Sequence, residues 1–280
     1  MTGPQPLLSV DELEVVYKGR GGKSFQALKG VSLDIRAGET VGLVGESGSG
    51  KTTIGRAILG LAKASSGRIT FDGRDITHLP HRERRDLAKD IQVVFQDPYT
   101  SLNPSMTVAD ILAEPLLIQG RTKRDAYGRV RELLDRVQLP SDASERLPRE
   151  FSGGQRQRVA IARAIALEPR LIICDEPVSA LDLTTQARVL DQLIEIQEDS
   201  GVAYLFVSHD LGVVRHISHR VTVLYRGEIV EQGEVDQVTA RPEHPYTQRL
   251  FMSAPVADVT QQRIRREQRR QLATEGKNTR

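Results

Sequence analysis

The sequence has 280 residues, enough to bury a full core as one large domain with an appendage or as two small domains. Its formal net charge of +2 gives no general case for nucleic-acid binding, and its single cysteine, Cys174, excludes an internal disulfide and suits a reducing compartment. Because neither an N-terminal signal segment nor a membrane-length apolar stretch occurs, we expect a soluble chain that meets a membrane only through a partner.

The first informative element is a predicted strand over residues 41–44 that runs into a glycine-rich loop. Residues 45–53 read Gly-Glu-Ser-Gly-Ser-Gly-Lys-Thr-Thr, the pattern of a phosphate-binding loop. Backbone N–H groups converge on phosphate oxygens in such a loop, Lys51 reaches the β- and γ-phosphates, and Thr52 is placed to hold Mg²⁺. A glycine-rich hairpin turn would leave Lys-Thr-Thr unexplained, and helical spacing follows the loop. We therefore expect a nucleotide to contact Gly45, Ser47, Gly48, Gly50, Lys51, Thr52 and Thr53.

Three more short apolar runs follow, and each ends in polar residues. Residues 91–95 precede Gln96-Asp97, residues 171–174 precede Asp175-Glu176, and residues 203–207 precede Ser208-His209-Asp210. Such runs, separated by helical segments, predict buried parallel strands. Gln96 or His209 in isolation would fit a polar strand end that meets water. Ligands bind outside the carboxyl ends of parallel strands, however, so the four sets together predict an active site.

A glycine pair lies between the second and third runs. Residues 151–155 read Phe-Ser-Gly-Gly-Gln and precede a predicted helix over 156–167. Ser before Gly-Gly at a helix start exposes unpaired N–H groups and the positive end of the helix dipole, which can hold an anion. Ser-Gly-Gly is also a common flexible turn, so this segment alone does not decide between the two.

The acidic pair Asp175-Glu176 suits phosphoryl transfer. Neighbours on a strand point to opposite faces, so one carboxylate can hold the Mg²⁺ shell while the other orients or deprotonates an attacking water. The reaction needs mainly positioning and charge neutralisation. A solvated surface pair is the alternative, but two like charges directly after Leu-Ile-Ile-Cys, at the mouth of a buried sheet, disfavour it.

In chain order, these motifs together with Ser179-Ala180-Leu181-Asp182 resemble the ATP-binding subunit of an ATP-binding-cassette (ABC) transporter, over roughly residues 8–240. The resemblance implies ATP and Mg²⁺ as ligands. It makes Tyr17 the aromatic that stacks on adenine, Glu176 the catalytic carboxylate and His209 a γ-phosphate contact. Gln96 would contact Mg²⁺ and report to membrane subunits, and the implied metal set is Thr52, Gln96 and Asp175. Phe151 stands where the family usually has Leu, a change between large apolar residues with little expected consequence.

The resemblance also implies nucleotide sites shared between two subunits. Ser152, Gly153, Gly154 and Gln155 would contact the ATP held by the opposite subunit, and Asp182 would lie at the dimer interface. A second anion site is redundant within a chain whose 45–53 loop already surrounds a triphosphate. We therefore expect a head-to-tail dimer, homomeric or heteromeric, that closes on ATP and opens after hydrolysis.

Two segments resemble the importer ATPases for oligopeptides, dipeptides and nickel: residues 96–104 and residues 244–255. This resemblance implies peptide uptake through two separate membrane permease subunits, supplied by an extracytoplasmic substrate-binding protein. Nickel or another small solute is the alternative cargo. The chain would then lie peripherally at the cytoplasmic face of the cell membrane, with no nucleic-acid partner. The physical role of the 244–255 segment is open, although Pro245 can open a helix at its first position.

Other nucleotide-binding classes fit less well. A signalling GTPase would carry an Asn-Lys-x-Asp guanine reader, which does not occur in the sequence. A DNA-repair or chromosome-organising ATPase would need a long coiled coil, and the segment between Gln96 and Ser152 is too short for one. A translation factor would carry two cassettes, whereas this chain has a single set of motifs.

We therefore predict an α/β fold of the P-loop NTPase class and the ABC type. A mostly parallel core sheet would be flanked by helices, with an antiparallel β portion from the N-terminal region. The ATP-binding domain would span residues 1–242, with a helical subdomain at about 97–165, and an extension would cover 243–280. Beyond residue 260 the extension is polar and basic, which predicts a solvated tail or attraction to anionic lipid.

Overall fold

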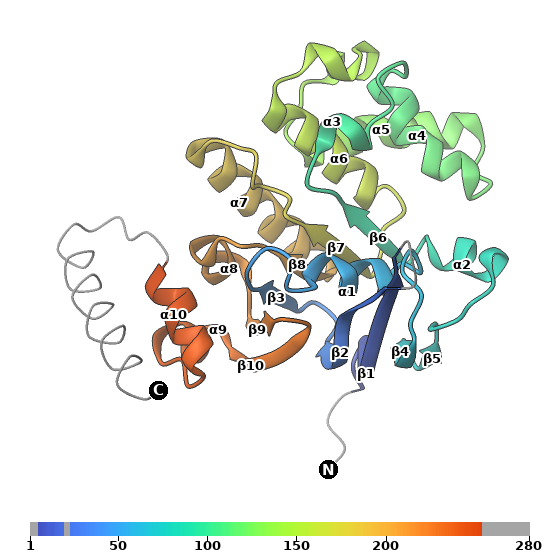
Figure 1. The fold of residues 1–280 in the computed structure, drawn as a ribbon. Coiled ribbons are helices and arrows are strands. Elements are labelled where there is room, and N and C mark those ends of the chain that lie inside the picture. The colour runs from blue at the N-terminus through green and yellow to red at the C-terminus, as the bar shows by residue number, and fades with distance from the viewer. Residues whose placement is uncertain (1–4, 20–22, 254–280) are drawn as a thin grey trace, which may run out of the picture.

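The computed structural model describes residues 5–19 and 23–253, whose strands form two sheets (Figure 1). The larger sheet has six strands in the order β10-β9-β3-β8-β7-β6. Four of the five strand pairs are parallel, and only β10 runs antiparallel to its neighbour β9. The strands are β3 (Thr40–Val44), β6 (Ile91–Val94), β7 (Leu171–Asp175), β8 (Ala203–Val207), β9 (Arg220–Tyr225) and β10 (Glu228–Glu234).

The four predicted apolar runs are β3, β6, β7 and β8. Phe95, placed in the second run by sequence, lies just beyond β6 and is 38% exposed. In β7 the apolar run is continuous because Leu171 and Ile173 belong to one hydrophobic core while Ile172 and Cys174 belong to another. A strand buried on both faces needs apolar residues at every position. Burial also raises the pKa of the Cys174 thiol, as expected for a core residue.

The smaller sheet is antiparallel and comes mainly from the N-terminal region. Its order is β2-β1-β4-β5. Helix α1 (Lys51–Ile58) packs between the two sheets, where Ile54 and Ile58 share a core with both. The predicted antiparallel portion beside a mostly parallel sheet is confirmed. Its strands are β1 (Leu8–Lys18), β2 (Ser24–Ile35), β4 (Ser66–Phe71) and β5 (Arg74–Asp75).

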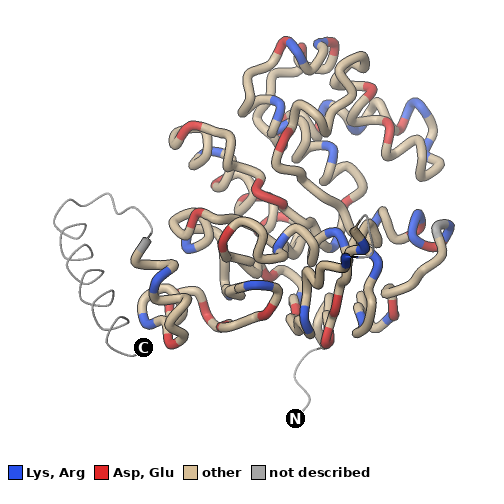
Figure 2. Tube along the Cα trace, in the orientation of Figure 1, with Lys and Arg blue, Asp and Glu red and all other residues tan. Residues whose placement is uncertain are grey.

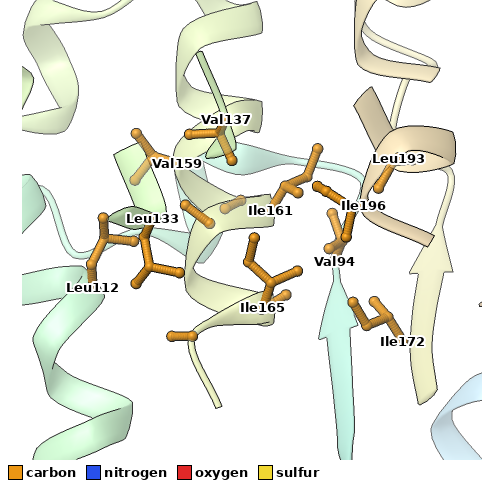
Figure 3. Close-up of a cluster of buried hydrophobic side chains, with 14 of the residues drawn as sticks. Val94, Leu112, Leu133, Val137, Val159, Ile161, Ile165, Ile172, Leu193 and Ile196 are labelled. Atoms are coloured by element: carbon orange, nitrogen blue, oxygen red, sulfur yellow. The ribbon is translucent and has the colours of Figure 1, made fainter. Parts of the chain in front are cut away.

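Helices α3 to α6 gather on one side of the larger sheet, at the top of Figure 1. Helix α6 joins this group to the sheet, because its side chains pack against α4 and α5 on one side and against β6 and β7 on the other (Figure 3). The group comprises α3 (Pro98–Ser101), α4 (Val108–Ile118), α5 (Lys123–Arg136), the short 3₁₀ helices η2 (Ser141–Glu145) and η3 (Pro148–Glu150), and α6 (Gly153–Ile165).

The remaining helices are α2 (His81–Leu87), α7 (Leu183–Ser200), α8 (Leu211–Ile217), α9 (Val235–Ala240) and α10 (Pro245–Ser253). A third core joins α8, α9 and α10 to β9 and includes Val221, Val238 and Tyr246. Pro245 opens α10, as its sequence position predicts. The last two residues of the 244–255 segment and the basic residues beyond 260 lie outside the described residues.

Acidic and basic residues are interspersed over the elements of both sheets and the helical group (Figure 2). Within residues 5–19 and 23–253, no helix combines the length and the apolar character needed to cross a membrane.

Candidate active site

A cleft of about 530 Å³ opens where β3, β6, β7 and β8 end. Most of the predicted site residues meet there: apart from Tyr17 on antiparallel β1, each follows the carboxyl end of a parallel strand or lies in the phosphate loop. Gly45 and Asp175 lie next to lining residues, whereas Ser152–Gln155 and Asp182 lie outside the cleft. The lining consists of Tyr17, Phe25, Ala27, Ser47, Gly48, Gly50, Lys51, Thr52, Thr53, Gln96, Glu176 and His209.

The phosphate loop bends sharply between β3 and α1. Gly45 has a φ of 154°, and a Cβ there would lie 2.1 Å from the carbonyl oxygen of Leu224, so only glycine fits against β9. Lys51 opens α1, and its Nζ donates to the carbonyl oxygens of Gly45 (2.8 Å) and Glu46 (2.9 Å). The pKa of the Lys51 ammonium is lowered by burial, against the opposing effect of Glu176 and Asp175. A bound polyphosphate would add negative charge beside this buried cation and so favour its charged form.

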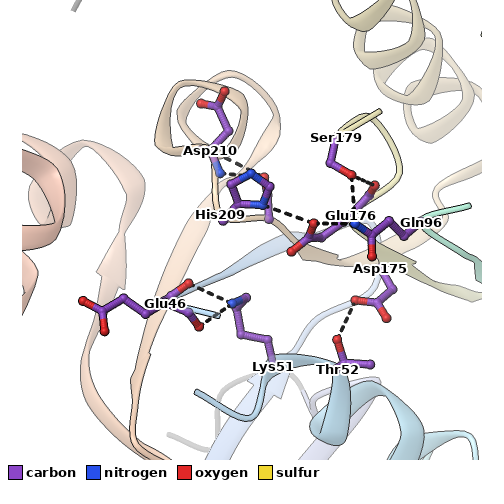
Figure 4. Close-up of polar contacts among 11 residues, drawn as sticks. Glu46, Lys51, Thr52, Gln96, Asp175, Glu176, Ser179, His209 and Asp210 are labelled. Atoms are coloured by element: carbon purple, nitrogen blue, oxygen red, sulfur yellow. Dashed lines mark hydrogen bonds and ion pairs between the residues drawn. The ribbon is translucent and has the colours of Figure 1, made fainter. Parts of the chain in front are cut away.

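Thr52 and Asp175 form a pair of oxygen donors suited to Mg²⁺. The Thr52 hydroxyl donates to Asp175 Oδ1 at 3.1 Å (Figure 4). The pKa of Asp175 is raised by burial, against the lowering effect of the Thr52 bond. No group of three or more His, Cys, Asp or Glu gathers as a metal site in the described part of the chain. Mg²⁺ usually binds through one or two carboxylates plus substrate phosphates, so the donors present fit an ion that arrives with a nucleotide.

Glu176 leaves the strand in a way that the sequence did not predict. Strand β7 ends at Asp175, and Glu176 takes the left-handed conformation, with φ 51°. The expectation that the two carboxylates alternate along a strand was therefore wrong, because a turn and not the strand's pleat separates them. Their tasks still differ, since Asp175 meets Thr52 while Glu176 turns toward Gln96 and His209 (Figure 4).

The Glu176 carboxylate lies between two polar side chains. Its Oε2 accepts from Gln96 Nε2 at 3.1 Å and lies 3.1 Å from His209 Nδ1. The Glu176 side chain is 19% exposed and that of His209 is 60% exposed, so the carboxylate is sheltered while the imidazole faces the open cleft. Asp210 holds the loop that carries His209, because its Oδ1 accepts from the N–H groups of Gly212 and Val213 at the start of α8. A sheltered carboxylate at the cleft can take a proton from a water molecule.

Two aromatic rings line the cleft. Tyr17 on β1 faces Phe25 on β2 across the antiparallel pair, and both line the cleft. Tyr17 is 40% exposed and Phe25 is 63% exposed. Phe25 was missed by the sequence analysis. The sequence does contain a signal for Phe25: Tyr17 and Phe25 flank the glycine-rich residues 18–24, and a hairpin would place the two aromatics opposite each other.

We expect Phe25→Ala to weaken ATP binding about 2- to 10-fold, because a base beside Tyr17 would lose one of two aromatic contacts. Calorimetric titration would compare ATP with inorganic triphosphate, which has no base. Tyr127→Ala, which removes a 42% exposed aromatic from α5, is the control. Equal losses for ATP and for inorganic triphosphate would contradict a contact with the base.

The second predicted anion site forms a capped helix start. The Ser152 hydroxyl accepts from the Gln155 N–H (3.3 Å), and Gln155 Oε1 accepts from the Ser152 N–H (2.9 Å). This capping box starts α6 at Gly153, three residues before the predicted start. The capping box satisfies the Gln155 N–H within the loop. Among the described residues, the N–H groups of Gly153 and Gly154 remain for an anion.

The start of α7 lies directly against this loop. A Cβ on Gly154 would lie 2.2 Å from Cγ2 of Thr185, so the two helix starts are in close contact. Asp182 caps α7, with its Oδ1 accepting from the Thr185 N–H at 3.0 Å, and the Thr185 hydroxyl holds the pKa of Asp182 below its usual range. The Ser152–Gln155 loop and Asp182 therefore form one surface region outside the cleft of their own chain.

Two family models match the chain. The ABC transporter model matches residues 28–179, which include the phosphate loop and Glu176. The model for the oligopeptide/dipeptide transporter C-terminal region matches residues 230–278. The second match includes α10 and the rest of residues 244–255, the segment to which the sequence alone assigned no physical role. That segment therefore belongs to a recognised family region.

Several curated proteins are similar over most of the chain. The oligopeptide transport ATP-binding protein OppF of Lactococcus lactis is 47% identical over 94% of this chain and 85% of its own length. A putative peptide import ATP-binding protein of Brucella ovis is 50% identical over 90% of this chain and 80% of its own length. The glutathione import ATP-binding protein GsiA of Pectobacterium atrosepticum is 48% identical over 94% of this chain, which spans only 43% of that relative.

Solved structures of ABC cassettes have the same fold. The cbiO1 protein of Clostridium perfringens, part of an ABC transporter complex, superposes with a TM-score of 0.76 at 30% identity and covers 85% of this chain and 92% of its own. The cassette MJ0796 was solved as a dimer in a post-hydrolysis state with ADP and Pi. It superposes with a TM-score of 0.74 at 31% identity, and the match covers 81% of this chain and 98% of that chain. The matched motifs, the site and the fold agree, and the chain belongs to the ATP-binding proteins of the ABC transporter family.

Proposed function

We propose that this chain is the ATP-hydrolysing subunit of an ABC importer for peptides. One observation carries the ATPase part: the phosphate loop, the Thr52–Asp175 pair and Glu176 meet around one cleft. The cargo follows from the relatives' names and from the match of residues 230–278 to the oligopeptide/dipeptide transporter C-terminal region.

The residues of the cleft divide the reaction between them. The loop's N–H groups and Lys51 bind the β- and γ-phosphates, and the Tyr17 ring stacks on adenine. Thr52, Gln96 and Asp175 would hold Mg²⁺, and the bound ion would supply charge neutralisation at the phosphates. Glu176 accepts the proton of the attacking water, and His209 contacts the γ-phosphate from the open side of the cleft.

The working unit is a head-to-tail dimer, homomeric or heteromeric. In it, Ser152, Gly153, Gly154 and Gln155 contact the ATP bound in the partner's cleft, and Asp182 lies at the dimer interface. The proposal is supported by the position of both segments in one region, outside the cleft of their own chain. A helix start with free N–H groups suits a phosphate that another subunit brings.

The transporter would contain two membrane permease subunits and receive cargo from an extracytoplasmic substrate-binding protein. The chain would lie at the cytoplasmic face of the membrane. We propose residues 1–242 as the ATP-binding domain and residues 243–280 as an extension. The grouping of α3 to α6 supports a helical subdomain at about 97–165.

Peptide should stimulate hydrolysis by the assembled transporter. Tyr99 lies on α3, just after Gln96-Asp97; the residue is 61% exposed, and its ring is stacked on the Arg156 guanidinium. We expect Tyr99→Ala to keep the basal ATPase rate of the isolated subunit and to abolish stimulation by peptide in the complex, because the 96–104 segment faces a permease. The measurement is ATP hydrolysis in reconstituted complexes with binding protein and either peptides, nickel chelates or sugars. Stimulation by a sugar alone would overturn the cargo assignment and leave the ATPase assignment intact.

A further inference from the structure

The C-terminal segment that begins α10 contacts the phosphate loop. Tyr246 is 3% exposed, and its hydroxyl accepts a hydrogen bond from the backbone N–H of Glu46 at 3.0 Å. Glu46 is the second residue of the 45–53 loop. The contact joins residues that are 200 positions apart in the sequence.

The peptide group that Tyr246 contacts also holds Lys51. Its N–H, from Glu46, donates to Tyr246, and its carbonyl, from Gly45, accepts from Lys51 Nζ at 2.8 Å. The next carbonyl, that of Glu46, accepts from Lys51 Nζ (2.9 Å) and from the Ser49 N–H (3.2 Å). One peptide plane is thus held from both sides, and its orientation decides where the Lys51 ammonium lies. Hydrogen bonds on both sides of one amide also strengthen each other.

Tyr246 itself is held firmly. The Glu231 carboxylate of β10 accepts from the N–H groups of Glu243 (2.8 Å) and His244 (3.0 Å), just before α10. The His244 imidazole then accepts from the Tyr246 N–H at 3.2 Å. The Tyr246 ring packs against Tyr225 of β9, with ring centroids 4.1 Å apart. The hydroxyl therefore reaches the loop from a rigid support.

We propose that Tyr246 is a positioning residue for the phosphate loop and that the C-terminal segment serves to orient the Gly45–Glu46 peptide for Lys51. The inference rests on the proposed nucleotide site and deepens it. Without the Tyr246 hydroxyl, the Glu46 N–H loses its hydrogen-bond acceptor, and the Gly45–Glu46 peptide plane can rotate. Lys51 would then be less well placed for a polyphosphate, while the packing of α10 stays intact.

The test is Tyr246→Phe, which removes one hydroxyl and keeps the ring on Tyr225. We expect its KM for ATP and its dissociation constants for ATP and ADP to rise about 2- to 10-fold, as one hydrogen bond is lost. The melting temperature without nucleotide should stay near that of the wild type. Tyr225→Phe is the matched control, since it removes the hydroxyl from the other ring of the pair, and no contact of that hydroxyl with the loop occurs among the described residues.

The outcomes distinguish a failure of the positioning role from a failure of the nucleotide site. A Tyr246→Phe protein with wild-type nucleotide affinity would overturn the positioning role, and so would a lower melting temperature with unchanged KM, which indicates a purely structural contact. Equal effects of the two substitutions would also overturn it, because the role belongs to one hydroxyl. A wild-type chain that bound no ATP would instead overturn the nucleotide site and, with it, this inference.

Discussion

Glu176→Gln is expected to bind ATP as tightly as the wild-type chain and to hydrolyse it at least ~100-fold more slowly. The amide keeps the shape of the side chain and can still contact Gln96 and His209, which lie 3.1 Å from Glu176 Oε2. It cannot accept a proton from the attacking water. Because binding is kept while turnover is lost, the ATP-bound dimer should accumulate.

The control for this variant comes from the same chain. Glu168 also takes the left-handed conformation, with φ 53°, but it pairs with Arg129 away from the cleft. Glu168→Gln therefore makes the same chemical change in a similar backbone setting and should hydrolyse ATP at the wild-type rate. Steady-state phosphate release and size-exclusion chromatography with ATP measure the two expectations. Wild-type turnover by Glu176→Gln would move the catalytic role to His209.

The sequence predicts the part of the site that follows from strand order. Parallel strands buried on both faces carry runs of apolar residues, as Leu171–Cys174 of β7 does, so their ends can be read to within about a residue. Because the carboxyl ends of parallel strands share one edge, the sequence alone suffices to bring Gln96, Glu176 and His209 together with Lys51.

The remaining features depend on local turns or on distant pairing. Glu176 was expected on the strand, but it takes a left-handed backbone directly after β7, although its N–H still donates to the Val207 carbonyl on the neighbouring strand. Phe25 depends on the register between β1 and β2, which the sequence does not state. The contact between Tyr246 and Glu46 spans 200 positions and has no local signal. Sequence patterns indicate which residues are buried and whether a segment has helix or strand periodicity, but they carry little information on contacts between distant segments.

Lys51→Ala is expected to remove most of the affinity for ATP. Lys51 is 6% exposed, and the partners of its ammonium in the structure include the carbonyl oxygens of Gly45 and Glu46. A polyphosphate in the loop would add charge-assisted bonds, which are roughly twice as strong as neutral ones. Calorimetry with ATP measures the loss, and Lys123→Ala is the matched control, since Lys123 is the exposed first residue of α5 as Lys51 is the first residue of α1.

A second substitution separates charge from packing at Lys51. Lys51→Met keeps an unbranched apolar stem in the buried position but removes the ammonium and its bonds to the loop. If the charge binds the phosphates, Lys51→Met should lose ATP as completely as Lys51→Ala. If the stem only supports the loop, Lys51→Met should bind almost normally, and the assignment of residues 45–53 as the phosphate site would fail. The carbonyls of Gly45 and Glu46 lose the same partner in both variants, so any difference between them reports on packing alone.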